Sequence, residues 1–331
     1  MKLFKVYMKG IMFMPVYVMI MILVCSCSKS ETVQKDMAIG FGAYLPGNMP
    51  QTKLAADATS FETTDQMGVY GYLVKDGDVL YSPAYISNCA LKHETGNIWD
   101  FDPDKYWPNI GYEAMNFYAY WPYSSSNPAS GTPGLSVIGR DNTYPYFTYK
   151  SDIAGGAKNE NFLVGQHSCW RETVDMEFKR PLAKVIIVVT YEDFIGTLGV
   201  DFTMPVISSG RFDYDPSGTE DGDGWDLTGA TTENLNFKST KQINGNSTSE
   251  YTLGTCYLIP QDIWKFSIKW NYHKESVIKD SSAEAEGVFK LVAGGSHTLK
   301  IHITKDNVIE VETSEGKDQW YTVRNENDLT K

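Results

Sequence analysis

The fold class of this chain can be read from Ala183-Lys184-Val185-Ile186-Ile187-Val188-Val189-Thr190, the most apolar run in its second half. Six of these eight residues are β-branched, and β-branched side chains favour the extended backbone of a strand. A strand that is apolar on both faces is typically covered on both sides. The run therefore predicts a central strand of a β-sheet.

Similar strand signals recur before and after this run, with turn residues between them. Lys75-Asp76-Gly77-Asp78 predicts a hairpin, and Lys305-Asp306-Asn307 predicts a second one near the C-terminus. No window keeps an amphipathic helical period for more than about two turns. The other segments expected to form strands are Met37–Tyr44, Met67–Val74, Val79–Tyr81, Asn116–Trp121, Phe266–Trp270, Thr298–Ile303 and Val308–Glu312.

This pattern predicts an all-β, mostly antiparallel protein, and a length of 331 residues favours two tandem β-sandwich domains. Two loop-like stretches, Ser124–Gly134 and Asp213–Asp226, need not mark a boundary. We place the boundary between residues 172 and 173, which gives an N-terminal domain of residues 37–172 and a C-terminal domain of residues 173–331.

The chain is acidic, with 41 Asp and Glu residues against 29 Lys and Arg residues and a net charge of −12. No basic stripe offsets this charge locally. Because such a surface repels phosphate backbones, the composition argues against nucleic-acid binding.

The first 26 residues predict a signal peptide. Lys2, Lys5 and Lys9 form a positively charged start, and 14 uncharged residues follow from Ile11 to Val24. That run is shorter than the roughly 20 residues that span a bilayer as a helix, so a transmembrane anchor or a buried helix is the weaker interpretation.

The signal ends in Val24-Cys25-Ser26-Cys27, which resembles the lipobox of bacterial lipoproteins. Cys27 is the expected lipidation site, because small Ser26 precedes it whereas bulky Val24 precedes Cys25. Several acyl chains on one protein anchor it stably where a single chain does not. Residues 27–36 are then expected to tether the protein to the outer membrane at the cell surface. The alternative is ordinary signal-peptide cleavage with two unmodified cysteines.

No catalytic or metal-binding motif is found in the sequence. His297 and His302 are five residues apart and would face opposite sides of one strand. Cys89, Cys169 and Cys256 are odd in number and far apart, so at most one disulfide can form, and small buried thiols are expected. The sequence predicts no enzyme, no cofactor and no metal.

Two further features each leave an alternative open. The carboxylates and glycines of Asp213–Asp226 could ligate Ca²⁺, but the stretch lacks the closing Glu of an EF-hand, and a solvated acidic turn is preferred. The tryptophans Trp99, Trp107, Trp121 and Trp225 could stack on sugar rings, which would make the chain a surface glycan-binding lipoprotein. At alternating strand positions such residues are more often core.

Short motifs along nearly the whole expected mature chain resemble the fimbrillin family, the lipoprotein precursors of protease-assembled type V pili. Each motif is short, and the resemblance depends on their order. The matching stretches are Gln51-Thr52-Lys53-Leu54, Phe61–Tyr72, Trp99, Tyr106-Trp107-Pro108, Asn116–Tyr123, Asn161–Gln166, Met176–Val185, Leu258-Ile259-Pro260 and Gly295–Ile303.

The resemblance implies two transthyretin-like β-sandwich domains and a structural or adhesive role in a fimbria. In this family the lipidated precursor is exported and cut by a trypsin-like protease after a basic residue. The first strand is lost, and a strand of a neighbouring subunit fills the vacated groove, a form of β-augmentation. The partners implied are other fimbrial subunits, the outer membrane through the lipid, and host or bacterial surface receptors.

Carried over to this sequence, the strand to be lost is Met37–Tyr44, and the cut falls between Lys53 and Leu54. The family usually has Arg where this chain has Lys53. Two outcomes follow: a protease that accepts Lys releases the strand, or the strand is retained and the subunit serves as an anchor or a terminal cap.

Overall fold

The computed structural model confirms the all-β prediction, because no helix occurs among the residues that it describes. Within those residues, no helix is long and apolar enough to cross a membrane. Ala38–Lys331 forms one compact unit. The described residues are 37–44, 61–80, 83–94, 98–109, 111–125, 135–138, 146–158, 162–191, 195–214, 224–244, 249–274, 277–303, 309–316 and 323–324.

Eight strands form the first sheet, in the order β3-β2-β4-β5-β1-β10-β9-β6. Strand β6 also pairs with β2 at seven register positions, so the sheet closes on itself in a barrel-like arrangement. All neighbouring strands in this sheet are antiparallel except β1 and β10, which run parallel. The strands are β1 Phe41–Tyr44, β2 Gln66–Lys75, β3 Asp78–Leu80, β4 Ile86–His93, β5 Ile98–Phe101, β6 Ala114–Trp121, β9 Leu163–Cys169 and β10 Val174–Lys179.

The core inside the first sheet is aromatic. Trp99, Trp107 and Phe117 are at most 2 % exposed, and the rings of Trp107 and Phe117 meet edge to face with centroids 5.7 Å apart. Strand β6 explains how one segment serves two cores: Phe117 packs into this core, whereas Tyr118 and Tyr120 face the opposite side and are also buried.

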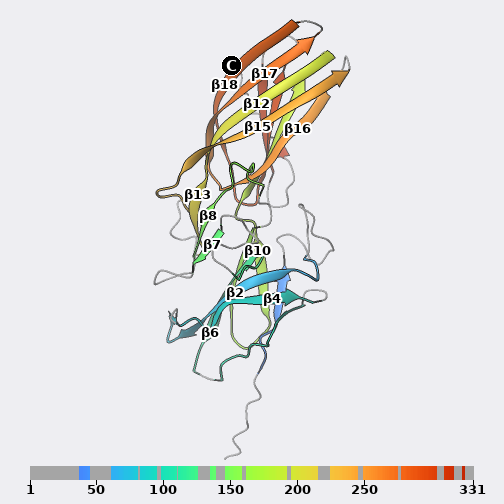
Figure 1. Ribbon diagram of the computed structural model, residues 1–331. Helices are drawn as coiled ribbons and strands as arrows, with labels where there is room; N and C mark the ends of the chain where they lie inside the picture. Colours follow the sequence, from blue (N-terminus) through green and yellow to red (C-terminus); the bar gives the residue numbers. More distant parts are fainter. Residues whose placement is uncertain are drawn as a thin grey trace, which may run out of the picture. The chain divides into compact units, whose positions relative to one another are not determined.

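Nine strands form two further sheets that pack face to face. The second sheet has the order β16-β11-β19-β20-β21 and the third the order β15-β12-β17-β18, whose long neighbouring strands are visible in Figure 1. Side chains of both sheets share one largely aliphatic core, which includes Ile187 of β11 and Val200 of β12. The strands are β11 Ala183–Tyr191, β12 Ile195–Ile207, β15 Thr232–Asn244, β16 Ser249–Leu258, β17 Asp262–Lys274, β18 Val277–Lys290, β19 Ser296–Ile303, β20 Ile309–Gly316 and β21 Val323–Arg324.

A small fourth sheet, β14-β13-β8-β7, adjoins a third core that is rich in tyrosine. The Tyr214 hydroxyl donates a hydrogen bond to the Ala119 carbonyl of β6, and Trp225 Nε1 donates to the Pro181 carbonyl over 2.7 Å. Burial raises the pKa of Tyr214 well above its ordinary value, so this hydroxyl stays protonated as a donor. The strands are β7 Leu135–Ile138, β8 Tyr146–Lys150, β13 Ser209–Asp213 and β14 Trp225–Asp226.

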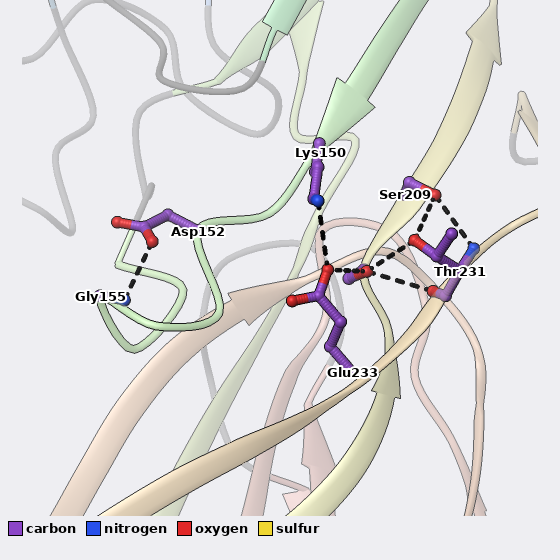
Figure 2. Close-up of polar contacts among 7 residues, drawn as sticks. Lys150, Asp152, Gly155, Ser209, Thr231 and Glu233 are labelled. Atoms are coloured by element: carbon purple, nitrogen blue, oxygen red, sulfur yellow. Dashed lines mark hydrogen bonds and ion pairs between the residues drawn. The ribbon is translucent and has the colours of Figure 1, made fainter.

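A polar network surrounds Ser208, the residue between β12 of the third sheet and β13 of the fourth (Figure 2). Ser208 is fully buried, and its Oγ lies 2.8 Å from Glu233 Oε1 and 2.9 Å from Thr231 Oγ1. Lys150 Nζ reaches the same Glu233 oxygen at 3.4 Å. The network joins β8, β15 and the β12–β13 connection, and it gives the buried Ser208 hydroxyl hydrogen-bond partners.

The local strand predictions agree with the observed elements. The Ala183–Thr190 run lies centrally, between β16 and β19, and the hairpin at Lys75–Asp78 joins β2 to β3. The second expected hairpin joins β19 to β20, although its turn lies outside the described residues. The boundary between residues 172 and 173 stays a prediction; β10, which follows it, pairs with β9 and β1 of the first sheet.

Candidate functional site

The expected exchangeable strand is the short strand β1, which lies between two strands from much later in the chain. Residues Phe41 to Tyr44 run parallel to β10, with Phe41 opposite Val174 and Tyr44 opposite Glu177. On its other side, β1 is antiparallel to β5 at only two register positions. We call the space between β5 and β10 that β1 fills the β1 slot.

Backbone hydrogen bonds extend this pairing toward the N-terminus. The Ile39 amide donates to the Lys105 carbonyl over 2.8 Å, and the Gly40 carbonyl accepts from the Val174 amide over 2.9 Å. An isolated bridge pairs Ala38 with Tyr106. The expected strand at Met37–Tyr44 is therefore shorter in the structure, with the regular part confined to its last four residues.

Alternate side chains of this segment point into the aromatic core. Ile39, Phe41 and Ala43 are each no more than 3 % exposed. The ring of Phe41 meets Phe101 and Phe117 edge to face, with centroids 5.5 and 5.2 Å apart. Burial of Ile39 and Phe41 stabilises the intact chain by about 1.5–3 kcal/mol for each side chain.

The chain returns to the same core at Phe61, 17 residues after Tyr44. Phe61 is buried and packs edge to face on Trp99 and Phe178, with centroids 4.9 and 5.6 Å away. The expected cleavage residues Lys53 and Leu54 fall between these two points, outside the described residues, as does Cys27. A cut at Lys53 would leave β1 on one fragment and every later strand on the other.

The four tryptophans suggested for sugar stacking do not form an exposed platform, and that interpretation of them is wrong. Trp99, Trp107, Trp121 and Trp225 are between 0 and 8 % exposed. They are buried in the first and third cores, where contacts with other side chains replace solvent. An aromatic ring covered on both faces cannot stack on a ligand.

The sequence did not single out Trp264, which is exposed in the structure. Trp264 of β17 is 65 % exposed, and it lies where the register between β17 and β18 shifts between Ile263 and Lys265. Both Trp264 and Lys265 face solvent there, so the regular alternation is broken. A local irregularity of this kind has no signature in the residue pattern.

A shallow pocket of about 350 Å³ lies beside β9 and β10 and was also not anticipated. Its floor includes Val164 and Tyr214, and polar side chains of Gln166, Glu177 and Lys179 line it. Glu177 is also the residue that pairs with Tyr44, so the pocket adjoins the β1 slot through β10.

Two of the residues considered for metal binding, Asp213 and Asp226, accept hydrogen bonds from neighbouring residues. Asp213 accepts hydrogen bonds from Arg211 at 2.9 and 3.1 Å, and Asp226 accepts one from the Thr228 amide, which holds the pKa of Asp226 below its ordinary value. Residues 215–223 between them lie outside the described part of the chain. Among the described residues, no group of three or more His, Cys, Asp or Glu side chains could hold a metal ion.

The remaining histidines and cysteines have structural surroundings. His297 is buried and accepts a hydrogen bond from the Val292 amide, whereas His302 lies on the other face of β19 beside Thr190. All three described cysteines are free thiols, and burial raises the pKa of Cys169 to about 12. Cys256 is completely buried, with its pKa raised for the same reason.

Together these sheets define an all-β protein whose short first strand is inserted between strands from later in the chain. The fimbrillin-like family model matches residues 52–316, and the chain belongs to this family. None of the curated proteins compared matches it.

Three of the solved structures similar to this chain are from Bacteroides. A crystal structure of a candidate cell adhesion protein from Bacteroides ovatus has a TM-score of 0.50 at 17 % identity, covering 84 % of this chain and 96 % of that one. Another candidate cell adhesion protein, from Bacteroides uniformis, has a TM-score of 0.48 at 14 % identity, covering 86 % and 99 %. A candidate adhesin from Bacteroides thetaiotaomicron has a TM-score of 0.44 at 9 % identity, covering 87 % and 98 %.

Proposed function

We propose that this chain is a structural or adhesive subunit of a surface fimbria, assembled by exchange of its first strand. It would be made as a lipoprotein on Cys27, exported to the cell surface, and cut between Lys53 and Leu54. Membership of the fimbrillin-like family supports the role. The observation that carries the strand-exchange step is the position of β1, a four-residue strand that lies between β5 and β10 and pairs with each at only a few positions.

The energetics favour such an exchange. Loss of β1 would open backbone groups of β5 and β10 that now pair with it, and would expose the core positions covered by Ile39, Phe41 and Ala43. Unpaired strand edges and uncovered apolar side chains are costly in water, so a strand from another subunit would bind there favourably. The partners would be other fimbrial subunits, and the role requires no catalytic step or cofactor.

The domain organisation is part of this proposal. The signal peptide, residues 1–26, and the tether, residues 27–36, would precede two tandem transthyretin-like sandwiches, residues 37–172 and 173–331. The closed first sheet and the face-to-face second and third sheets support two β-sandwich bodies. The slot would take β5 from residues 37–172 and β10 from residues 173–331, and the second and third sheets would remain folded throughout assembly.

Limited trypsin digestion of the chain without its signal peptide tests the proposal. The wild type and the control Lys75→Gln, which changes an exposed hairpin lysine, should be cut once after Lys53 and then give detergent-resistant oligomers on an unboiled gel. Lys53→Gln should stay uncut and monomeric. Cleavage at Lys53 followed by unfolding without any oligomer would contradict assembly by strand exchange.

A second function, surface glycan binding, is favoured by one observation, the 65 % exposure of Trp264. An exposed indole can stack on a sugar ring. Retardation in polysaccharide affinity gels that is lost in Trp264→Ala and kept in Leu80→Ala, another exposed apolar residue, would support it. Equal mobility of both variants and the wild type across common polysaccharides would exclude this role for Trp264.

A further inference from the structure

The shallow pocket beside β9 and β10 is built on the outer face of the first sheet. Glu177 pairs with Gln166 and Lys179 with Val164, and directly opposite residues of an antiparallel pair project from the same face. On β10 the residues that alternate with them lie in the first core. Tyr214, which belongs to the third core, also lines the pocket. The pocket therefore opens on the face of these strands that the first core does not use.

The floor and the rim of this pocket differ in exposure. Val164 and Tyr214 on the floor are 0 and 1 % exposed, and the Tyr214 hydroxyl already donates to the Ala119 carbonyl. The three polar residues on the rim are exposed. Because so little of the floor is accessible, the rim has to supply most of the binding energy. Hydrogen bonds rather than apolar contacts would therefore hold a ligand there.

The rim offers three different hydrogen-bonding groups. The Gln166 amide donates and accepts, the Glu177 carboxylate accepts, and the Lys179 ammonium donates. The side chains of Gln166 and Glu177 form no hydrogen bond or ion pair with another residue in the part of the chain that the structure describes. The Lys179 ammonium lies 5.5 Å from the centre of the Phe212 ring, which places it toward β13. A ligand in the pocket can therefore meet donors and acceptors at the same time.

The charges on the rim are balanced and spaced for a neutral ligand. Glu177 and Lys179 carry opposite formal charges, and residues two positions apart on a strand are about 7 Å apart, so their head groups can reach different sides of one small ring. An anionic ligand would be repelled by Glu177 and by a chain with a net charge of −12. A volume of about 350 Å³ is near the lower end of the range for small-molecule sites, about 300–1,000 Å³. The site therefore fits one small, neutral ring that carries several hydroxyl groups.

We infer that this pocket binds one neutral sugar residue of a surface glycan. Each sugar hydroxyl both donates and accepts, so neighbouring hydroxyls donate to Glu177 and accept from Lys179, while Gln166 does either. The inference rests on the adhesive form of the proposed function and names the chemical class of its receptor. It does not involve Trp264, where the sugar would stack on an exposed ring of β17. A single shallow site binds weakly, but repeated copies along a fimbria would raise the avidity.

NMR titration of the intact chain without its signal peptide tests the site. The probes are glucose, galactose, mannose, fucose and N-acetylglucosamine, with glucuronic acid as the anionic comparison. At least one neutral sugar should shift the backbone amide signals of Gln166 and Glu177 in a saturable manner. That sugar should bind more tightly than glucuronic acid, because the rim has no net positive charge.

Two substitutions and two controls locate the binding. Glu177→Gln keeps the size of the side chain and removes its charge, and Gln166→Leu removes both groups of the amide. Each should weaken binding by about tenfold or more, because each removes hydrogen bonds to the ligand. Asp175→Asn, on the same exposed face of β10 but outside the pocket, and Trp264→Ala should change it by less than about twofold.

The outcomes separate this inference from strand exchange. The inference would be overturned by the absence of a saturable shift with every neutral sugar, by tighter binding of glucuronic acid, or by a response that both pocket variants leave unchanged. A loss confined to Trp264→Ala would assign the sugar to that tryptophan and would also overturn it. None of these titrations cuts the chain or removes β1, so their failure leaves strand exchange intact, and the trypsin digestion tests that step separately.

Discussion

Strands β1 and β11 have the same kinds of neighbours but very different lengths of pairing. Each lies between one parallel and one antiparallel partner. Strand β1 pairs at four positions with β10 and two with β5, whereas β11 pairs at nine positions with β16 and eight with β19. The same arrangement of neighbours is therefore formed by few paired residues at β1 and by many at β11.

Their cores differ in the same sense. Strand β11 contributes Val185, Ile187 and Val189 to the aliphatic core that the second and third sheets share. Strand β1 contributes one aromatic ring, Phe41, and the small side chain of Ala43 to a core that other segments already fill with aromatic rings. We therefore expect the first sheet to tolerate loss of β1 better than the second sheet would tolerate loss of β11.

The largest expected effect is that of Phe41→Ala. Truncation of a buried phenylalanine should lower the free energy of unfolding of the uncut chain by about 3–5 kcal/mol. Cleavage at Lys53 and removal of β1 also remove residue 41. The cut wild type and the cut Phe41→Ala protein should therefore be identical. Urea titrations of cut and uncut samples measure this. An equally stable uncut Phe41→Ala chain would mean that β1 is not seated in the core.

Ile187→Ala should cost about 2–5 kcal/mol, because it leaves a cavity at a fully buried position of β11. In contrast to Phe41→Ala, this loss should persist after β1 is removed. The same urea titrations on both forms test it. A loss confined to the uncut chain would show that the second core depends on β1, which breaks the comparison.

Tyr120→Phe should lower the free energy of unfolding by about 1–3 kcal/mol. The Tyr120 hydroxyl lies 2.7 Å from Asn88 Oδ1 and 2.9 Å from the Ser124 carbonyl, and it accepts a hydrogen bond from the Ser124 amide. Asn88 Nδ2 still donates to the Ser124 carbonyl in this variant, which limits the loss. Thermal unfolding at pH 7 measures the change, and a more stable variant would contradict the assignment.

The pH dependence of the same residue has a definite sign. Burial raises the pKa of Tyr120 to about 12, above its ordinary value of 10, so the folded state keeps a proton that the unfolded chain loses first. The stabilisation is fully present below pH 10 and declines between about pH 10 and 12. Tyr120→Phe should therefore flatten the alkaline fall in stability between pH 9 and 11.5. Superimposable curves for the two proteins would contradict this.

Ser208→Ala should have the smallest effect, about 0.5–1.5 kcal/mol, since it removes one buried hydroxyl from the network in Figure 2. The Ser208 hydrogen bond is the main cause of the lowered pKa of Glu233. That pKa should rise toward its ordinary value in the variant, as followed by NMR titration of the carboxyl carbon. An unchanged Glu233 titration would show that Ser208 does not donate to it.

Local sequence patterns predicted the strands well, but they did not indicate which distant strands pair. The β-branched run at β11 and the hairpin at Lys75–Asp78 carry their own signals in residue type. The closure of the first sheet through β2 and β6 depends on pairs such as Gly68 with Tyr120. No periodicity of the sequence indicates which of such distant residues pair. The parallel pairing of β1 with β10 joins residues more than 130 positions apart for the same reason.

Aromatic residues set a second limit. The sequence could not distinguish buried Trp99 from exposed Trp264, because both occur in strand segments and their environment depends on which sheet covers each face. An exchangeable first strand was expected from family resemblance, but that β5 and β10 are its neighbours is recognisable only from the folded structure.

Hydrogen exchange of the Val174 amide, compared with amides of β11, tests the central claim most directly. The Val174 amide, which donates to Gly40, should be protected in the uncut chain, exchange rapidly after β1 is removed, and regain protection in oligomers. Amides of β11 around Ile187 should stay protected in all three states. Protection of Val174 that survives the loss of β1, or simultaneous loss of protection in β11, would contradict the account.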